Sequence, residues 1–356
     1  MNTEVYRIAD PANLTDADIS AIERAGVIIK DGGLAVFPTE TVYGLGASAY
    51  SPDAAAAVYT AKGRPSDNPL IVHVAAPAEA EAFAEVSDTY NDLAKRFMPG
   101  ALTVILPKKD VIPHAVTGGL STVAVRCPSD PVARELIRRA GVPVAAPSAN
   151  LSGKPSPTKA EHVVRDLSGR VDMILDGGDC TFGLESTVLK PEGDKRVRIL
   201  RPGAVTAEML ENAGYTVIVD SAVTDLGAVG ENPESPGMKY KHYSPTAEVI
   251  LVDMGECDRA FADVVAELAS TKDHRYAVLC HSDDTAGFAD DAVIFTCGED
   301  GCADDMAHEL FASLRAADDA GVSEIYVPLP KKSGIGLAVY NRIIRAAGGR
   351  IVKPEN

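Results

Sequence analysis

Three dense polar blocks constrain the fold of this chain more than any other feature. They are PTETVYGLG (Pro38–Gly46), KGRPSDNP (Lys62–Pro69) and PSANLSGKPSPT (Pro147–Thr158). Each adjoins a short apolar run of the kind that forms a strand, and each combines Gly or Pro with hydroxyl or amide side chains. Ligands of α/β folds bind outside the ends of the strands, so polar loops at these ends favour an α/β fold with a ligand site.

Strand and helix patterns alternate through the first part of the chain. Ser51-Pro52-Asp53 is a strong helix start, with a capping serine and a proline in the first turn, and that helix is expected to end at Gly63. Further strands are expected at 34–38, 69–75, 102–107, 122–127, 142–147, 171–175 and 186–190. Further helices are expected at 15–28, 78–86, 89–97, 130–140 and 159–167. This alternation predicts an α/β domain with a mixed sheet.

A second domain is predicted after an irregular segment. The chain has 356 residues, more than one average domain. Residues 220–246 are rich in turn formers and read as a linker between a domain at 1–219 and another at 247–356. Strands are expected there at 247–253, 276–280, 292–296 and 324–329, and helices at 259–270, 304–320 and 337–347. GIGLAVYN (Gly334–Asn341) lacks the full GxGxxG pattern, and its glycines indicate a helix start packed closely on the sheet.

Net charge restricts the partners of this chain. The formal net charge is −17, and residues 245–356 alone hold 10 Lys and Arg against 20 Asp and Glu. A strongly acidic surface argues against broad electrostatic binding of nucleic acid. Any site for an anion must therefore be local.

Three further classes of protein find no support. No apolar run approaches the roughly 18 residues of a membrane span. The N-terminus shows no basic region followed by an apolar stretch, so no secretion signal is expected and a cytoplasmic location is the default. The 6 Cys residues form no CxxC and no zinc spacing, so we expect reduced cysteines and no protein-bound metal.

Cations in and near the blocks suggest a local anion site. Lys62 and Arg64 lie at the end of the helix that begins at Ser51, where the helix dipole alone could account for them. A phosphate clamp uses the same pair of residue types. Arg126 ends a strand, where it could bind a carboxylate or form a surface ion pair. His73 within an apolar strand reads as a packed core histidine. Ser and Asn in the third block fit either neutral donors to a ligand or ordinary turn chemistry.

No covalent catalytic motif is present. The sequence contains no GxSxG, HExxH or Walker A pattern. Any catalysis should therefore rest on positioning and electrostatic stabilisation.

Taken together, the blocks resemble the YrdC-type threonylcarbamoyl-AMP synthase family in its long, two-domain form. The matching pieces are PTETVYGLG, KGRPSDNPL, TVAVR, PSANLSGKPSPT, ESTVL, RPG and, before the second domain, SPGMKYKHYSP. The resemblance implies a twisted mixed sheet with a concave ligand face, followed by a small Rossmann-like α/β domain. It also implies a nucleotidyltransferase that converts L-threonine, bicarbonate and ATP to threonylcarbamoyl-AMP and pyrophosphate. A downstream transferase then moves the threonylcarbamoyl group to tRNA.

The same resemblance implies roles for particular residues. The catalytic set comprises Lys62, Arg64, Ser148 and Asn150. The ATP-binding set comprises Lys62, Arg64, Asn68, Thr122, Ser148, Asn150, Ser156, Arg201 and Tyr243, with Mg²⁺ expected on the phosphates. The threonine-binding set comprises Thr39 or Thr41, His73, Arg126 and Ser186, with Arg126 taking the carboxylate. Tyr243, in the segment 220–246, is expected to act as a lid that keeps water from the labile product.

Two other functions remain open at the level of sequence. The concave face could bind tRNA or double-stranded RNA, although the net charge counts against this. Carbamoyl transfer from carbamoyl phosphate, as in related domains of hydrogenase-maturation proteins, is the other alternative. Those proteins carry acylphosphatase-like and zinc-finger segments, and this chain has neither.

Overall fold

The computed structural model describes residues 1–228, 234–235, 243–255, 257–270, 275–299 and 302–355. The chain forms two compact units. The first comprises Met1–Ser152 and Ser156–Lys239, and the second comprises Gly153–Pro155 and Tyr240–Asn356.

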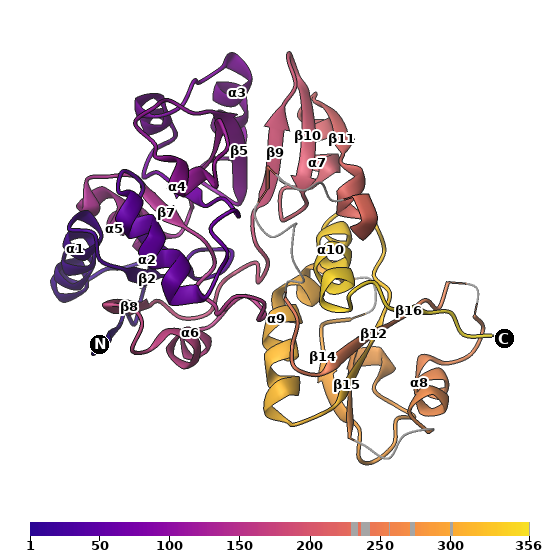
Figure 1. The fold of residues 1–356 in the computed structure, drawn as a ribbon. Coiled ribbons are helices and arrows are strands. Elements are labelled where there is room, and N and C mark those ends of the chain that lie inside the picture. Colours follow the sequence, from indigo (N-terminus) through magenta and orange to yellow (C-terminus); the bar gives the residue numbers. More distant parts are fainter. Residues whose placement is uncertain (229–233, 236–242, 256, 271–274, 300–301, 356) are drawn as a thin grey trace. The chain divides into compact units, whose positions relative to one another are not determined.

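The first unit is built on a mixed sheet of 11 strands in the order β1-β8-β2-β3-β7-β4-β6-β5-β9-β10-β11. Its strands are β1 (Glu4–Arg7), β2 (Ala35–Phe37), β3 (Gly44–Ser48), β4 (Ile71–His73), β5 (Leu102–Pro107), β6 (Thr122–Arg126), β7 (Val144–Ala146), β8 (Met173–Asp176), β9 (Thr187–Pro191), β10 (Arg196–Arg201) and β11 (Thr216–Val219). Its α-helices are α1 (Asp16–Lys30), α2 (Pro52–Lys62), α3 (Asp88–Phe97), α4 (His114–Thr117), α5 (Pro131–Ala140), α6 (Ala160–Leu167) and α7 (Ala207–Asn212). Figure 1 shows α1 and α5 packed side by side within this unit. The predicted α/β fold with a mixed sheet is confirmed.

Both faces of the central strands are buried. In β2, Val36 belongs to one hydrophobic cluster, while its neighbours Ala35 and Phe37 belong to another. Successive side chains of a strand point to opposite faces, so these two clusters cover the two sides of the sheet. A strand buried on both faces has room for polar side chains only at its ends, which is where the three blocks lie.

Several local predictions needed correction. The α-helix expected at 78–86 is a 3₁₀ helix, Pro77–Ala82. The end of the first block is strand β3 rather than a loop, because Gly44–Ser48 pairs with both β2 and β7. The sequence reading also did not include the strands β1, β10, β11 and β16 (Ile351–Val352). In β10 the signal was present, since buried Val197 and Ile199 alternate with less buried arginines.

The second unit is a parallel sheet flanked by helices. Its strands are β12 (Glu248–Val252), β13 (Tyr276–Cys280), β14 (Val293–Thr296), β15 (Glu324–Pro328) and β16, in the order β14-β13-β15-β12-β16. Its helices are α8 (Phe261–Ser270), α9 (Ala303–Asp319), α10 (Gly336–Ala346) and the 3₁₀ turn η4 (Ser282–Asp284). The neighbouring strands of this sheet pair in parallel, so the carboxyl ends of its strands meet at one edge. The expected second α/β domain is confirmed (Figure 1).

The segment between the units is described only in part. Residues 220–228 contain two short 3₁₀ turns, Ser221–Val223 and Leu226–Ala228. Most of SPGMKYKHYSP (Ser235–Pro245) lies outside the described residues. Across the part of the chain that is described, no helix combines the length and apolar character that a bilayer span needs.

Candidate active site

The second and third blocks meet at the side chain of Lys62. Helix α2 ends at Gly63, whose φ of 61° is a left-handed conformation that glycine adopts without strain. The Lys62 side chain is 2% exposed. Its Nζ donates to the carbonyl oxygens of Ser148 at 2.5 Å and Asn150 at 2.6 Å, and to Asn150 Oδ1 at 3.3 Å. The ammonium therefore fixes the backbone of the third block, and two segments distant in sequence form one cationic centre.

The remainder of the second block forms a hydrogen-bonded loop around a buried amide. Arg64 donates to the carbonyl oxygens of Asn68 at 3.3 Å and Pro69 at 3.1 Å, and Tyr59 also donates to the Asn68 carbonyl. The Asn68 side chain is 2% exposed, and among the described residues neither its Oδ1 nor its Nδ2 has a hydrogen-bond partner. A buried amide without partners is costly, so this group is a candidate to bind a ligand.

The third block continues into a second polar cluster on β9 and β10. Ser156 donates its hydroxyl to Glu185 Oε1 at 2.5 Å. The guanidinium of Arg201 donates to the Ser186 carbonyl at 3.0 and 3.1 Å and to the Ser186 hydroxyl at 3.2 Å. Gly203 allows this arrangement, because a Cβ there would lie 2.4 Å from the backbone nitrogen of Thr187. Glu185 and Ser186, the two residues before β9, thus bond to Ser156 and Arg201 respectively. This brings together three residues of the predicted site: Ser156, Ser186 and Arg201.

A row of polar side chains crosses three strands of the sheet. His73 on β4 pairs with Arg126 on β6, and Arg126 pairs with Thr103 on β5. Residues at paired positions point to the same face of a sheet, so the three side chains project together. The hydroxyls of Thr103 and Ser186 are 2.8 Å apart and extend the row to the second cluster. The register therefore unites His73, Arg126 and Ser186, which sequence reasoning had placed together only through resemblance.

Arg126 makes a buried ion pair with Glu40 of the first block. Its Nη2 lies 2.9 Å from Glu40 Oε1, and the two side chains are 5% and 6% exposed. The flanking hydroxyls of Thr39 and Thr41 are 2.9 Å apart, and Thr39 also donates to the Val42 carbonyl at 2.6 Å. The first block thus presents a carboxylate and a linked hydroxyl pair beside the strand-end arginine.

Burial and charge set the protonation of this row. Burial, together with the Arg126 charge, lowers the pKa of His73 to about 3, so the imidazole is neutral at physiological pH. Burial alone would raise the pKa of Glu40, but the Arg126 guanidinium outweighs it and holds the pKa below its usual value. Burial raises the pKa of Asp130 to about 6, with the Glu40 carboxylate adding to the rise. His73 is therefore no general base here, and Asp130 titrates closer to neutral pH than an ordinary aspartate.

Two predicted residues lie elsewhere. Thr122 begins β6, at the opposite end of that strand from Arg126, where it lines a separate cavity of about 530 Å³. Tyr243 belongs to the second unit, where its ring stacks on Phe311 with centroids 5.1 Å apart and lies near the Arg342 guanidinium. The proposed lid role of Tyr243 remains a prediction.

Sequence reasoning gave no role to three residues that organise the site. They are Glu40, Thr103 and Glu185. Glu40 and Glu185 each stand as the one acidic residue in an otherwise uncharged polar stretch that borders a strand, and that isolation was a usable signal. Thr103 lies inside an apolar strand, and only the sheet register brings it to the site.

Fold and site together define a class of protein. A twisted mixed sheet presents buried cations, with backbone carbonyls and hydroxyls arranged around them. Such a site suits an α/β enzyme that holds a polyanion and a small carboxylate side by side and acts by positioning.

Comparisons with known proteins identify the family. A family profile described as "Telomere recombination" matches residues 27–203, and one described as "Threonylcarbamoyl-AMP synthase, C-terminal domain" matches residues 205–348. The chain is 43% identical over 348 residues to the threonylcarbamoyl-AMP synthase of Bacillus subtilis, covering 97% of each chain. It is 42% identical over 333 residues to that of Pyrococcus abyssi, covering 93% of this chain and 95% of the relative. The solved structure of P. abyssi Sua5 complexed with L-threonine matches with a TM-score of 0.88 at 38% identity, covering 100% of both chains.

The chain belongs to the threonylcarbamoyl-AMP synthase family. Both family profiles and both full-length relatives agree with the resemblance found in the sequence, so that prediction is confirmed. The predicted enzyme class, a nucleotidyltransferase, is confirmed with it.

Proposed function

We propose that this protein synthesises threonylcarbamoyl-AMP from L-threonine, bicarbonate and ATP, for modification of tRNA. The observation that carries the proposal is the connection between two clusters in the first unit. Lys62, Arg64 and Asn68 form a cationic and amide-rich cluster, and Arg126 lies in a polar row that ends at Ser186. Because Ser156 and Arg201 bond to the adjacent residues Glu185 and Ser186, a nucleotide on one cluster would lie beside an amino acid on the other.

The roles proposed for these residues follow from charge and hydrogen-bonding capacity. Lys62 and Arg64 neutralise the triphosphate, with Asn68, Ser148, Asn150, Ser156 and Arg201 around them as further contacts to phosphate or nucleoside. Arg126 binds the threonine carboxylate, since a guanidinium forms charge-assisted, two-point bonds with a carboxylate. In this proposal the carboxylate takes the position on Arg126 that Glu40 occupies, and Thr39 or Thr41, His73 and Ser186 complete the amino-acid site.

The proposed reaction proceeds in two steps. The threonine amine adds to carbon dioxide derived from bicarbonate and loses a proton, which gives a carbamate. A carbamate oxygen then forms a bond to the α-phosphorus of ATP, the bond from that phosphorus to the bridging oxygen breaks, and pyrophosphate leaves with the electron pair. The neutral His73 orients substrate without taking the proton. The cations stabilise charge on the phosphates as it shifts toward the leaving pyrophosphate.

Magnesium enters this proposal as part of the substrate, MgATP. Among the described residues, no group of three or more His, Cys, Asp or Glu side chains could hold a metal ion. The candidate phosphate cluster is built from cations, carbonyls and hydroxyls, which suit a phosphate chain carrying its own ion. The residues present therefore do not form a protein cage for Mg²⁺.

Pyrophosphate release tests the proposal directly. We expect release from ATP to require both threonine and bicarbonate, and threonylcarbamoyl-AMP to accumulate in equal amount by mass spectrometry. Release independent of threonine would refute the assignment, and turnover of carbamoyl phosphate would favour the alternative transfer reaction.

The partners of this protein and its cellular location are further proposals. We propose that a downstream transferase receives the product, that the protein works in the cytoplasm where its tRNA pathway operates, and that any contact with tRNA or double-stranded RNA is weak. A shift assay with duplex RNA across salt concentrations tests the last point, and tight binding at physiological salt would contradict it.

A further inference from the structure

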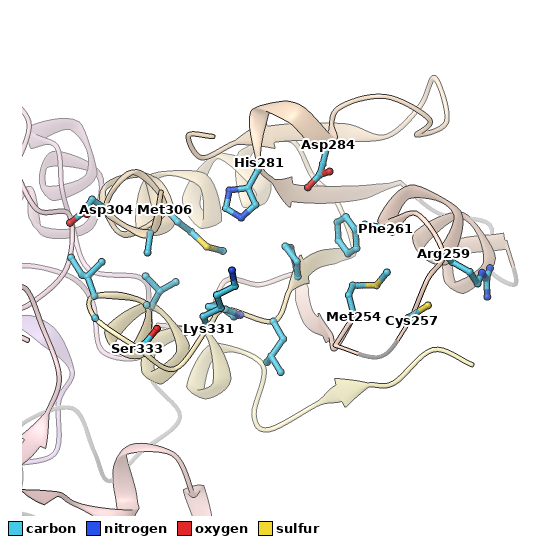
Figure 2. Close-up of a pocket in the computed structure, with 18 residues that line it drawn as sticks. Met254, Cys257, Arg259, Phe261, His281, Asp284, Asp304, Met306, Lys331 and Ser333 are labelled. Carbon is cyan, nitrogen blue, oxygen red and sulfur yellow. The ribbon is translucent and has the colours of Figure 1, made fainter. Parts of the chain in front are cut away.

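The second unit has a cavity of its own at the carboxyl edge of its sheet. Its volume is about 580 Å³, and it is lined by the residues that follow β12, β13 and β15 and by the starts of α8, α9 and α10. Figure 2 shows the lining side chains converging from these elements. The volume falls within the range of about 300–1,000 Å³ typical of sites for small organic ligands.

Topology places this cavity at a switch point of the sheet. From β13 the chain continues to its neighbour β14, while from β15 it passes through α10 to β16 on the far side of β12. The loops after β13 and β15 therefore leave in opposite directions from adjacent strands, which opens a crevice between them. Open α/β sheets bind ligands in crevices of this kind. His281 lines it from the β13 loop, and Lys331 lines it from the β15 loop.

The lining combines apolar side chains with charged ones. Met254, Phe261 and Met306 contribute apolar and aromatic surface. Lys331 and His281 point toward one another across the opening (Figure 2). Lys331 has no carboxylate partner among the described residues, although residues 245–356 carry 20 acidic side chains against 10 basic ones.

Other charged groups limit what the cavity can hold. Arg259 is already paired with Glu267 at 2.7 Å. Asp284 and Asp304 also line the cavity, so a ligand with several negative charges would be repelled. One uncompensated lysine suits a ligand with a single anionic group.

A glycine at the start of α10 shapes the loop that carries Lys331. A Cβ on Gly336 would lie 2.5 Å from the Lys331 carbonyl oxygen, so glycine lets the loop fold back over the helix start. The close contact is therefore with the preceding loop, and not with the sheet as predicted for GIGLAVYN. The fold-back holds Lys331 beside the first turn of α10, an 11-residue helix whose start has no side-chain cap. Backbone N–H groups in a first turn favour anions.

We propose that this cavity is a second ligand site, which binds a nucleoside monophosphate. The phosphate is bound by Lys331 and the first turn of α10. The base packs on Phe261 and the methionines, and a ribose hydroxyl donates to Asp284. A free amino acid would leave much of the 580 Å³ unfilled, and a triphosphate would place too much charge near the two aspartates.

Counting bound ligand tests this proposal on the full chain. In equilibrium dialysis with radiolabelled AMP, we expect 2 equivalents per wild-type chain, roughly one for each site. Lys331→Ala should weaken the second equivalent by about ten-fold or more, the loss expected for a hydrogen bond to a charged group. Lys332→Ala is the matched control, because its Nζ lies 4.3 Å from the Tyr340 ring centroid and Lys332 does not line the cavity. Inorganic phosphate and adenosine, used as competitors of AMP, test binding of the phosphate and of the nucleoside separately. Each alone should compete weakly.

Binding to the first unit is separated by a second variant. Lys62→Met/Arg64→Met should lose the equivalent that belongs to the proposed active site and keep the one in the second unit. One equivalent that disappears with Lys62 and Arg64 and survives Lys331→Ala would overturn this inference and leave the proposed function intact. A single equivalent that survives Lys62→Met/Arg64→Met and disappears with Lys331→Ala would support the inference and count against the active-site assignment. Circular dichroism and thermal melting confirm that each variant folds.

Discussion

The buried pair of Arg126 and Glu40 gives the sharpest test of the site. Arg126→Met keeps much of the side-chain length but removes the guanidinium, and it leaves Glu40, 6% exposed, without its partner at 2.9 Å. Removing one member of a buried ion pair typically costs about 3–5 kcal/mol, because a charge stays buried alone. Glu40 can escape this penalty by taking up a proton.

The free energy of protonating Glu40 sets the size of the loss in stability. From the ordinary glutamate value of 4.5, protonation at pH 7 spans 2.5 units. At about 1.36 kcal/mol per unit this is about 3 kcal/mol, and at pH 5 it falls to about 1 kcal/mol. The variant should therefore lose about 3 kcal/mol at pH 7 and much less at pH 5. For a unit of this size that corresponds to a drop of about 6–12 °C in the melting temperature at pH 7.

The assay is scanning calorimetry of the full chain at pH 5 and 7, since the two units need not unfold together. Glu40→Gln/Arg126→Met is the matched control: it removes both charges and should recover most of the lost stability. Both variants should raise the threonine KM by about ten-fold or more, because the carboxylate loses a charge-assisted partner. A single variant as stable as wild type at pH 7, or a threonine KM unchanged in both, would refute the reasoning.

Three further predictions use other parts of the first unit. Lys62→Met should lower pyrophosphate release by about 100-fold or more, because a cation that stabilises the phosphates is lost. Lys30, an exposed lysine also in a last helical turn, is the control, and Lys30→Met should leave the rate unchanged. Equal turnover in both variants would exclude the phosphate clamp. Asp130 has a pKa raised to about 6, so its contribution to stability is present below its unfolded value of 3.8 and is lost as pH rises through 6. Asp130→Asn should flatten the free energy of unfolding, measured with urea, between pH 4 and 7. A profile that still falls over this range would implicate another group. Gly203→Ala would place a Cβ 2.4 Å from the Thr187 nitrogen, so overpacking should destabilise the unit by about 1–3 kcal/mol. Melting indistinguishable from wild type would show that the backbone yields there.

Some of the site was readable from local sequence. Proline and glycine around short apolar runs placed the blocks at strand ends, and Ser51, Pro52 and Gly63 defined both ends of α2. Such signals act within a few residues, so they survive without knowledge of the fold. Their ordered combination was also specific enough to identify the family.

The pairing of distant segments was decided only by the tertiary structure. That Lys62 bonds to the carbonyls of Ser148 and Asn150, and that Arg126 lies between Thr103 and His73, depends on strand order and register. Register is set by which faces of many strands are buried at once, a property of the whole sheet and not of any window of sequence. The sequence therefore determined which residues could bind and react, and the packing of the sheet determined which of them meet.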